Sequence, residues 1–518
     1  MKSFPQVIKS TKGNVLQIGR GFPYNPKVFR NNAIPGRRLP GAPEAENSGL
    51  KFERGEMGMN ATQRLTGLAI LAALCLILGN GLSAIAQAPA AGAGQDTGAA
   101  KYTMAEYNAY QACAGEKVPA TLIKCLDDFV SKYPNSTLLN YVYPLYYQAY
   151  SAQKNYLKMI ESADKLAALA EKIDALTRFN AYYTHATAYY AMVSDQKDGA
   201  NASKDAALAK AAQAAAASAL KTLEEVKKPD GVTDEAWAKQ KTVSQLTLNG
   251  IAAQAAMNAK DCSGAVGSYK AALALNPDDL TFNYRLGQAY LCMNPPQQMD
   301  AFWSIARAVT AKGATQAQSA KVKDYLRKLI VNYQGGTVCD SLTDAELNEL
   351  LQLAGSSAER PASYSVPSAA DLSAAQKDMT ILTVITDLKA GGDKAKLTWL
   401  AACGLEFPEV LAKVIEVVPG TDSVVLKMAF VTSDAEFEAA TTPNMEVKVV
   451  GQPEAARVEK DTAIHFTGTL VAYDPEPAFF LHWDKAKVKG EDIPKEKGTP
   501  KKPPVRKPVP RKPAAKPS

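Results

Sequence analysis

Apolar residues recur at helical spacing through the middle of the chain, from Tyr102 to about Ala354, and strand-like stretches are missing there. This periodicity predicts helices joined by short turns. We expect them over 104–115, 119–132, 137–152, 155–171, 174–193, 203–227, 234–258, 263–275, 280–292 and 300–311. Two further helices, 314–334 and 342–355, would cap the array. Paired helices with short turns indicate internal repeats.

The clearest repeat is DCSGAVGSYKAALALNPDDLTFNYRLGQAYL, residues 261–291. Small residues would let neighbouring helices approach closely, tyrosines would fill the gaps beside them, and Pro277 would end one hairpin. The residues that carry this pattern are Ala265, Tyr269, Ala272, Leu286, Gly287 and Tyr290. The stretch resembles the tetratricopeptide repeat (TPR) family. The resemblance implies a TPR-type α-solenoid of helical hairpins over 102–355.

Other copies of the repeat are less regular. They read NYLKMIESADKLAALAEK after TLLNYVYPLYYQAY, LIKCLDDFVSKYPNS, and DAFWSIARAV. Pro144 stands where the family pattern has a small helical residue, and helix 203–227 is longer than the family's. Stacking several such hairpins would build one continuous core that no single hairpin can bury.

Five short runs rich in β-branched and aromatic residues follow the helices. They read VLAKVIEVV, SVVLKMAFV, MEVKVV, AIHFTGTLVAY and AFFLHW, separated by turn residues. We expect a small all-β domain over 409–488, with an order that looks like an OB-type barrel. Residues 356–408 would connect it to the repeats. The connector comprises a linker, SSAERPASYSVPS (356–368), a helix over 369–388, and a glycine turn in KAGGDK.

An apolar block, Leu68 to Leu78, follows Arg64 and precedes small residues at Ser83–Ala88. This pattern predicts a signal peptide over 59–88, and an uncleaved membrane anchor is the alternative. Residues 1–58 would then be an untranslated or disordered leader, and 89–101 a linker. Both alternatives place the rest of the chain outside the cytoplasm, in the periplasm or cell envelope of a bacterium.

Charge is unevenly distributed. Residues 1–58 carry a formal charge of +6 and residues 494–518 carry +8, so the part between them carries −7. A mildly acidic body argues against a nucleic-acid partner. The tail, 489–518, is rich in proline and lysine, which predicts an extended, disordered segment. It is either a solubilising end or a contact to an anionic envelope surface.

Motifs for catalysis or cofactor binding are missing. The sequence has three histidines and no HExxH, GxSxG or cysteine–histidine zinc spacing. We therefore predict no catalytic residue, no cofactor and no metal. Six cysteines follow the signal segment. Cys262 begins one predicted helix and Cys292 ends the next, so a disulfide between them is attainable. Cys113 and Cys125 fit a bridge less well, because they lie at different distances from the intervening turn.

Tyrosines crowd the helices at 137–152 and 174–193, either as packing residues or as the wall of a peptide groove. The TPR resemblance implies that the first helices of successive repeats line the binding face. On these helices we expect Gln254, Tyr284 and Gln288 to neighbour one another as a protein-binding groove. The sequence thus predicts an exported adaptor that binds an unidentified protein or peptide. A tethered envelope structural protein, or an enzyme subunit, is the alternative.

Overall fold

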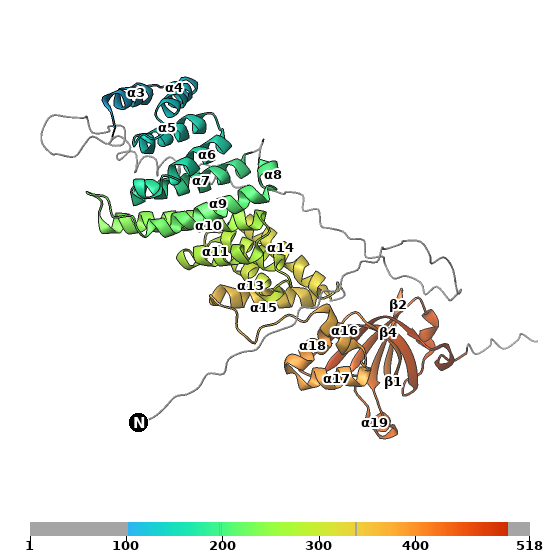
Figure 1. Ribbon diagram of the computed structural model, residues 1–518. Coiled ribbons are helices and arrows are strands. Elements are labelled where there is room, and N and C mark those ends of the chain that lie inside the picture. The colour runs from blue at the N-terminus through green and yellow to red at the C-terminus, as the bar shows by residue number, and fades with distance from the viewer. Residues whose placement is uncertain (1–101, 196, 198, 337–338, 496–518) are drawn as a thin grey trace, which may run out of the picture. The chain divides into compact units, whose positions relative to one another are not determined.

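The computed structural model describes residues 102–495 except 196, 198, 337 and 338 (Figure 1). The signal segment over 59–88, the leader, the linker and most of the basic tail lie outside these residues. Within them the chain is mainly helical and ends in a small five-stranded barrel. Of the helices described, none combines the length and the apolar character that a membrane span requires.

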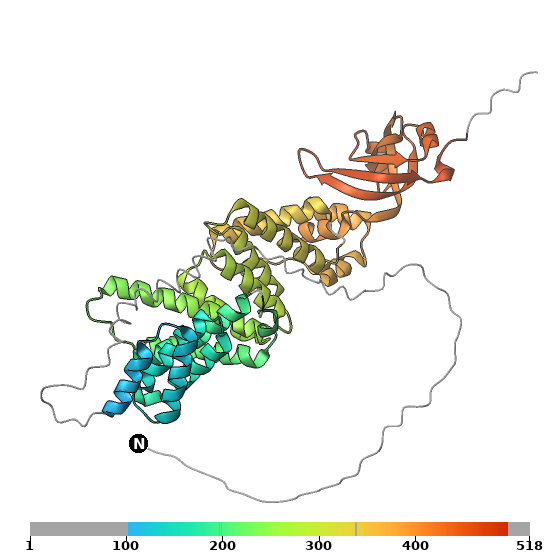
Figure 2. The ribbon, with the colours of Figure 1, turned by 90° about the horizontal axis from the view of Figure 1, so that it is seen from above.

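Six pairs of helices follow one another along the first part of the chain, and each helix packs on the next (Figures 1 and 2). The pairs are α3 (Met104–Ala114) with α4 (Pro119–Lys132), α5 (Leu139–Ala152) with α6 (Tyr156–Ala167), α7 (Ala175–Ser194) with α9 (Ala206–Leu223), α10 (Asp234–Asn258) with α11 (Cys262–Leu275), α12 (Leu280–Cys292) with α13 (Gln298–Val309), and α14 (Gln316–Tyr333) with α15 (Asp340–Ser356). The short α8 (Gly199–Ala202) lies between α7 and α9. First helices also touch across pairs, as α7 and α10 do.

Side-chain caps fix where most of these helices begin. Asp174, Asp261 and Asp279 each accept a hydrogen bond from a backbone N–H in the first helical turn. Such caps satisfy donors that a helix start leaves without an intrahelical partner. The predicted stop at Pro277 is found, because α11 ends at Leu275 and α12 begins at Leu280.

Small residues bring the helices together. An ideal Cβ added to Gly287 of α12 would lie 2.4 Å from Ile305 Cγ1 and 2.9 Å from the carbonyl oxygen of Ala301, both on α13. Ala253, Ala256 and other alanines are fully buried in the core cluster that α10, α11, α12 and α13 share. A side chain at position 287 would therefore prevent the close packing of α12 on α13.

The segment after α15, which its composition predicts to be a linker, is held against a repeat helix. The indole Nε1 of Trp303 donates to the carbonyl oxygen of Ala358, and Arg307 donates to the carbonyl oxygens of Ala354 and Ser357. Farther along, Arg360 forms an ion pair with Asp300 at 3.3 Å. Residues 357–366 thus lie along α13, held by polar side chains that belong to the repeat helix.

Three short helices follow: α16 (Ala369–Gln376), α17 (Ile381–Ala390) and α18 (Gly392–Ala402). The prediction of one helix over 369–388 was wrong, because Thr380 and Thr383 form a capping box that starts α17 anew. Helix α18 was not predicted at all. Gly391 and Gly392 form the expected turn with φ of 72° and 70°, but the helix resumes directly after Gly391.

The barrel closes in the order β1-β2-β3-β5-β4. Its strands are β1 (Glu406–Pro419), β2 (Ser423–Phe430), β3 (Met445–Val450), β4 (Ala463–Asp474) and β5 (Phe480–Val488). Strands β3 and β5 run parallel, and the other pairs are antiparallel. The long β1 pairs with both β2 and β4, with register shifts where it bends. The helix α19 (Asp434–Ala439) joins β2 to β3.

Alternating residues of the strands fill the barrel. Leu426, Met428, Val447 and Phe466 are almost completely buried, with polar or half-exposed residues between them. The buried face of α17, including Leu388, belongs to the same core. The barrel and α17 consequently share one hydrophobic core.

Candidate functional site

Two of the predicted groove residues lie together on α12. Gln288 Nε2 donates to Tyr284 Oη at 3.0 Å, one helical turn away. The ring of Tyr284 meets Tyr325 of α14 edge-to-face, with centroids 5.6 Å apart. Gln288 is also hydrogen-bonded to Tyr325. Burial, together with the neighbouring Tyr325, raises the pKa of Tyr284 to about 12. These three half-buried residues form a phenol–amide cluster across two first helices.

Gln254 belongs to a second cluster. Its Nε2 donates to Asn258 Oδ1 at 3.1 Å, and Asn258 Nδ2 donates to Tyr189 Oη of α7 at 2.8 Å. One turn before Gln254, an ideal Cβ at Gly250 would lie 3.1 Å from the ring of Phe282 on α12. The α10 face that carries Gln254 therefore approaches α12, but Gln254 is hydrogen-bonded within α10 to Asn258, which in turn bonds to α7. None of these interactions joins Gln254 to Tyr284 or Gln288, with which we expected it to form a groove.

The two clusters repeat one chemical pattern. In each, an amide on one first helix is linked to a tyrosine on a neighbouring first helix, and the amide side chains stay partly exposed. Arg285 is hydrogen-bonded to Tyr269, whose pKa burial raises. Amides both donate and accept hydrogen bonds, and phenol rings add apolar contact area. This combination is suited to the backbone of a bound polypeptide.

Sequence reasoning missed Asn258 and Tyr325. Asn258 lies four residues after Gln254, a spacing that places both on one helix face, so this partner was within reach of the pattern. Tyr325 lies on α14, which we expected to be only a cap.

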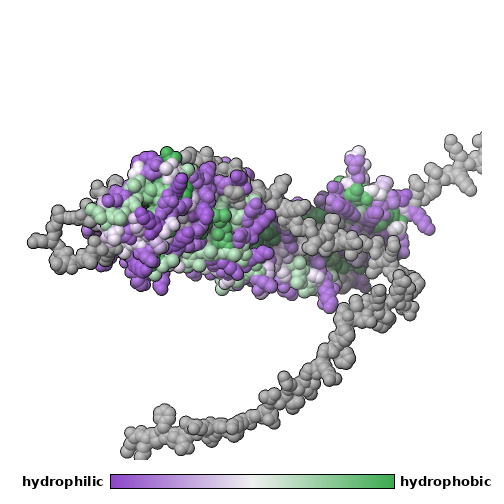
Figure 3. Space-filling view, turned by 45° about the horizontal axis from the view of Figure 1, so that its top comes forward, coloured by the Kyte–Doolittle hydropathy of each residue, from purple (hydrophilic) through white to green (hydrophobic). Residues whose placement is uncertain are grey.

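On the face shown in Figure 3, hydrophilic residues cover most of the surface and hydrophobic residues lie in smaller areas between them.

The crowded tyrosines of α5 and α7 are largely packing residues. Tyr143, Tyr146 and Tyr189 are buried, whereas Tyr190 is 38% exposed. The hydroxyl of Tyr146 donates to Asp127 at 2.7 Å, and burial raises the pKa of Tyr146. The first part of the array therefore uses most of these rings to hold helices together.

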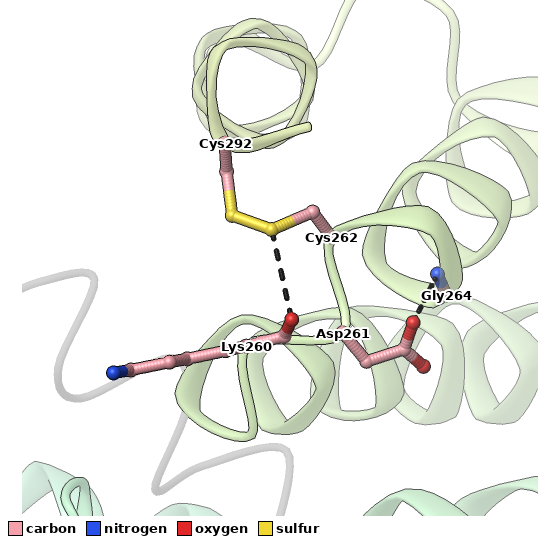
Figure 4. Close-up of a disulfide and its surroundings, with 5 residues drawn as sticks. All are labelled: Lys260, Asp261, Cys262, Gly264 and Cys292. Carbon is pink, nitrogen blue, oxygen red and sulfur yellow. Dashed lines mark hydrogen bonds between the residues drawn. A yellow bond between two sulfur atoms is a disulfide. The ribbon is translucent and has the colours of Figure 1, made fainter. Parts of the chain in front are cut away.

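Cys262 and Cys292 are joined in the structure, with Cα atoms 5.7 Å apart. Figure 4 shows the start of α11 beside the end of α12, and Asp261 accepting a hydrogen bond from the backbone N–H of Gly264. The third bridge, Cys339–Cys403, joins the residue before α15 to the residue after α18. The sequence did not suggest this pair, because 64 residues separate the two cysteines.

Cys113 and Cys125, the weaker of the two candidate pairs in the sequence, are also bonded, with Cα atoms 5.5 Å apart. Cys125 lies six residues into α4, about 9 Å along its axis, whereas Cys113 is next to the last residue of α3. The four residues between the helices include an extended Val118. Such a turn spans up to about 13 Å, which accommodates the offset.

Each histidine contacts an aspartate: His185 with Asp164 at 2.6 Å, His465 with Asp492 at 3.1 Å and His482 with Asp474 at 2.8 Å. Over residues 102–495, with their four gaps, no three His, Cys, Asp or Glu side chains gather as a metal-binding group.

The chain matches no protein-family model, and searches of the curated proteins and of the solved structures found no match either.

Proposed function

We propose that this protein is an exported adaptor of the TPR type, which binds a protein or peptide partner without catalysing a reaction. The observation that carries the proposal is a row of partly exposed amides and phenols on successive first helices: Gln254 and Asn258, positioned by the buried Tyr189, and Tyr284 with Gln288 and Tyr325. A stack of hairpins presents its first helices side by side, and such a surface suits an extended ligand.

The packing of the helices supports the assignment to a TPR-type solenoid. Six pairs follow one another, each packed on its neighbours, and Gly287, Ala265 and Ala272 occupy the close contacts that the family pattern requires. The length of α10 and Pro144 within α5 are departures from that pattern. For the barrel we propose an OB-type fold, a five-stranded Greek-key barrel, because the closed order and the single parallel pair suit it.

Export is supported by the cysteines. The structure pairs all six of those that follow residue 88. Disulfides persist in the periplasm and outside cells and are rare in the cytosol. We therefore place the protein in the periplasm or cell envelope, where the basic tail would contact anionic surfaces.

Site-specific photo-crosslinking tests the binding surface. A photoreactive residue at Gln288 should give a discrete crosslinked product in cells. The same residue at Ala274, exposed on the second helix α11, should not. Equal crosslinking from both positions, or none from either, would remove the support for a first-helix site.

Affinity for the captured partner then tests the clusters. We expect Tyr284→Ala to weaken binding by roughly 1–2 kcal/mol or more if this ring is a hot spot. Because Tyr284 packs on Tyr325, the variant is also expected to melt earlier. Tyr284→Phe is the control: it keeps the ring contact and removes only the hydroxyl. If every loss of affinity is matched by a loss of folded protein, Tyr284 is a packing residue.

A further inference from the structure

A buried amide and a carboxyl group meet between the last two repeat helices. Gln334, directly after α14, is 1% exposed, and its Nε2 donates to Glu346 Oε2 of α15 at 2.7 Å. The other end of the amide, Oε1, is also buried and accepts no hydrogen bond from any residue that the structure describes. A buried carbonyl oxygen without a donor has lost its hydrogen bonds to water and gained none in exchange, which is destabilising.

Protonation of Glu346 would supply the missing donor. An ionised carboxylate only accepts hydrogen bonds, so it can satisfy the NH₂ group of Gln334 but not the oxygen. A neutral carboxylic acid carries one O–H in addition to its acceptor oxygen. Placed against a primary amide, it forms two parallel hydrogen bonds, N–H to oxygen and O–H to oxygen, and leaves neither group without a partner.

The surroundings of Glu346 favour its neutral form. Burial raises the pKa of Glu346, and Glu349, one turn along the same helix, acts in the same direction. The charge of Lys396 on α18 lowers the pKa of Glu346. This effect is weakened because Lys396 is 65% exposed and forms an ion pair with Glu349 at 3.4 Å. The remaining titratable neighbour is Tyr364, whose own pKa is raised by burial, so it stays a neutral phenol.

We propose that Gln334 and Glu346 form a proton-dependent clasp between α14 and α15, which closes when Glu346 takes up a proton and loosens when it loses it. Helix α15 follows Cys339, which is bonded to Cys403 at the end of α18. The clasp therefore acts on α15, the repeat helix that begins next to this disulfide bond. A change of acidity would alter how firmly this junction is held.

The pH window follows from the direction of the shift. The folded protein holds the proton on Glu346 more tightly than the unfolded chain does. The stabilising contribution is thus complete below the ordinary glutamate pKa of 4.5, and it is lost as the pH rises through the raised pKa of Glu346.

Hydrogen exchange of the full chain at a series of pH values tests the clasp. In the wild type, protection factors of the α15 amides should rise by roughly 2- to 10-fold as the pH falls through this window, as expected for one added hydrogen bond. Glu346→Gln carries a neutral amide at every pH. The α15 amides of this variant should be as protected at pH 7 as those of the wild type are at low pH, and their protection should not change with pH.

Glu349→Gln is the matched control, because it removes the same charge from the same helix outside the amide pair. It should keep a pH dependence of α15 protection, with the midpoint moved to lower pH because Glu349 acts to raise the pKa of Glu346. Loss of the dependence in Glu349→Gln, or low α15 protection in Glu346→Gln at all pH values, would overturn the proposal. Should either variant fail to fold, carboxyl NMR of the wild type decides. Titration of Glu346 at an ordinary glutamate pH would refute the clasp, and a raised value would support it.

Discussion

In the repeat helices the buried side chains form separate clusters, each shared by a few neighbouring helices, whereas the barrel with α17 and α18 has a single core. The helical clusters are rich in alanine and tyrosine, and each joins helices that follow one another along the chain. The barrel core is rich in valine and also joins strands that are not consecutive, β1 with β4 and β3 with β5. Damage should therefore stay local in the repeats and spread through the whole barrel.

The largest effect is expected in the barrel core. Phe466 is 1% exposed and meets Trp483 edge-to-face at 5.3 Å. Phe466→Ala should cost about 3–5 kcal/mol because it leaves a cavity between strands. Hydrogen exchange should show lost protection in all five strands and unchanged protection in α3–α12. Loss confined to β4 would contradict the idea of one shared core.

Removing the Cys262–Cys292 bridge should cost about 3.5 kcal/mol, because the bridge closes a loop with a sequence separation of 30 in the unfolded chain. We expect the double variant Cys262→Ser, Cys292→Ser to lose protection over α10–α13 while the barrel stays as it was. Thiol labelling of exported, non-reduced protein checks the starting point. Both cysteines should resist labelling, and reaction of both would show that the bridge is not formed.

Gly287→Ala should cost about 1–3 kcal/mol, because the new methyl group would overlap Ile305 and the backbone of Ala301. Chemical unfolding followed by hydrogen exchange should place the damage at α12 and α13. Gly267 on α11 is the matched control, since an added Cβ meets nothing within 4 Å. Gly267→Ala should stabilise the helix by about 0.5–1 kcal/mol. Equal effects at both glycines would argue against a close helix contact at Gly287.

The smallest effect belongs to the helix surface. Lys158 and Lys165 hold the pKa of Glu161 down at about 2. Because Glu161 is 45% exposed and Lys158 52% exposed, water and salt screen these ion pairs and each should contribute little to stability. This contribution is present above the ordinary pKa of 4.5 and is lost as the pH falls toward 2. Glu161→Gln should lower the melting temperature slightly at pH 7, and high salt should erase the difference.

Local patterns determined what the sequence could predict. The mainly helical class and the small β domain were confirmed, because periodicity and turn residues are properties of short windows. The contact between Tyr284 and Gln288 follows from their spacing of four residues. The sequence could not predict that residues 357–366 lie along α13 or that Tyr284 packs on Tyr325. Both contacts depend on side chains from helices that are distant in sequence. Helix α18 was missed because two glycines precede it.

The Cys339–Cys403 bridge also determines how the chain would carry mechanical load. If the two ends of the protein were pulled apart, tension would pass through the sulfur–sulfur bond and bypass the residues between the two cysteines. With a sequence separation of 64, the bypassed segment would lengthen the chain by roughly 200 Å once released. Stretching of single molecules should reveal this hidden length only when a reductant is present.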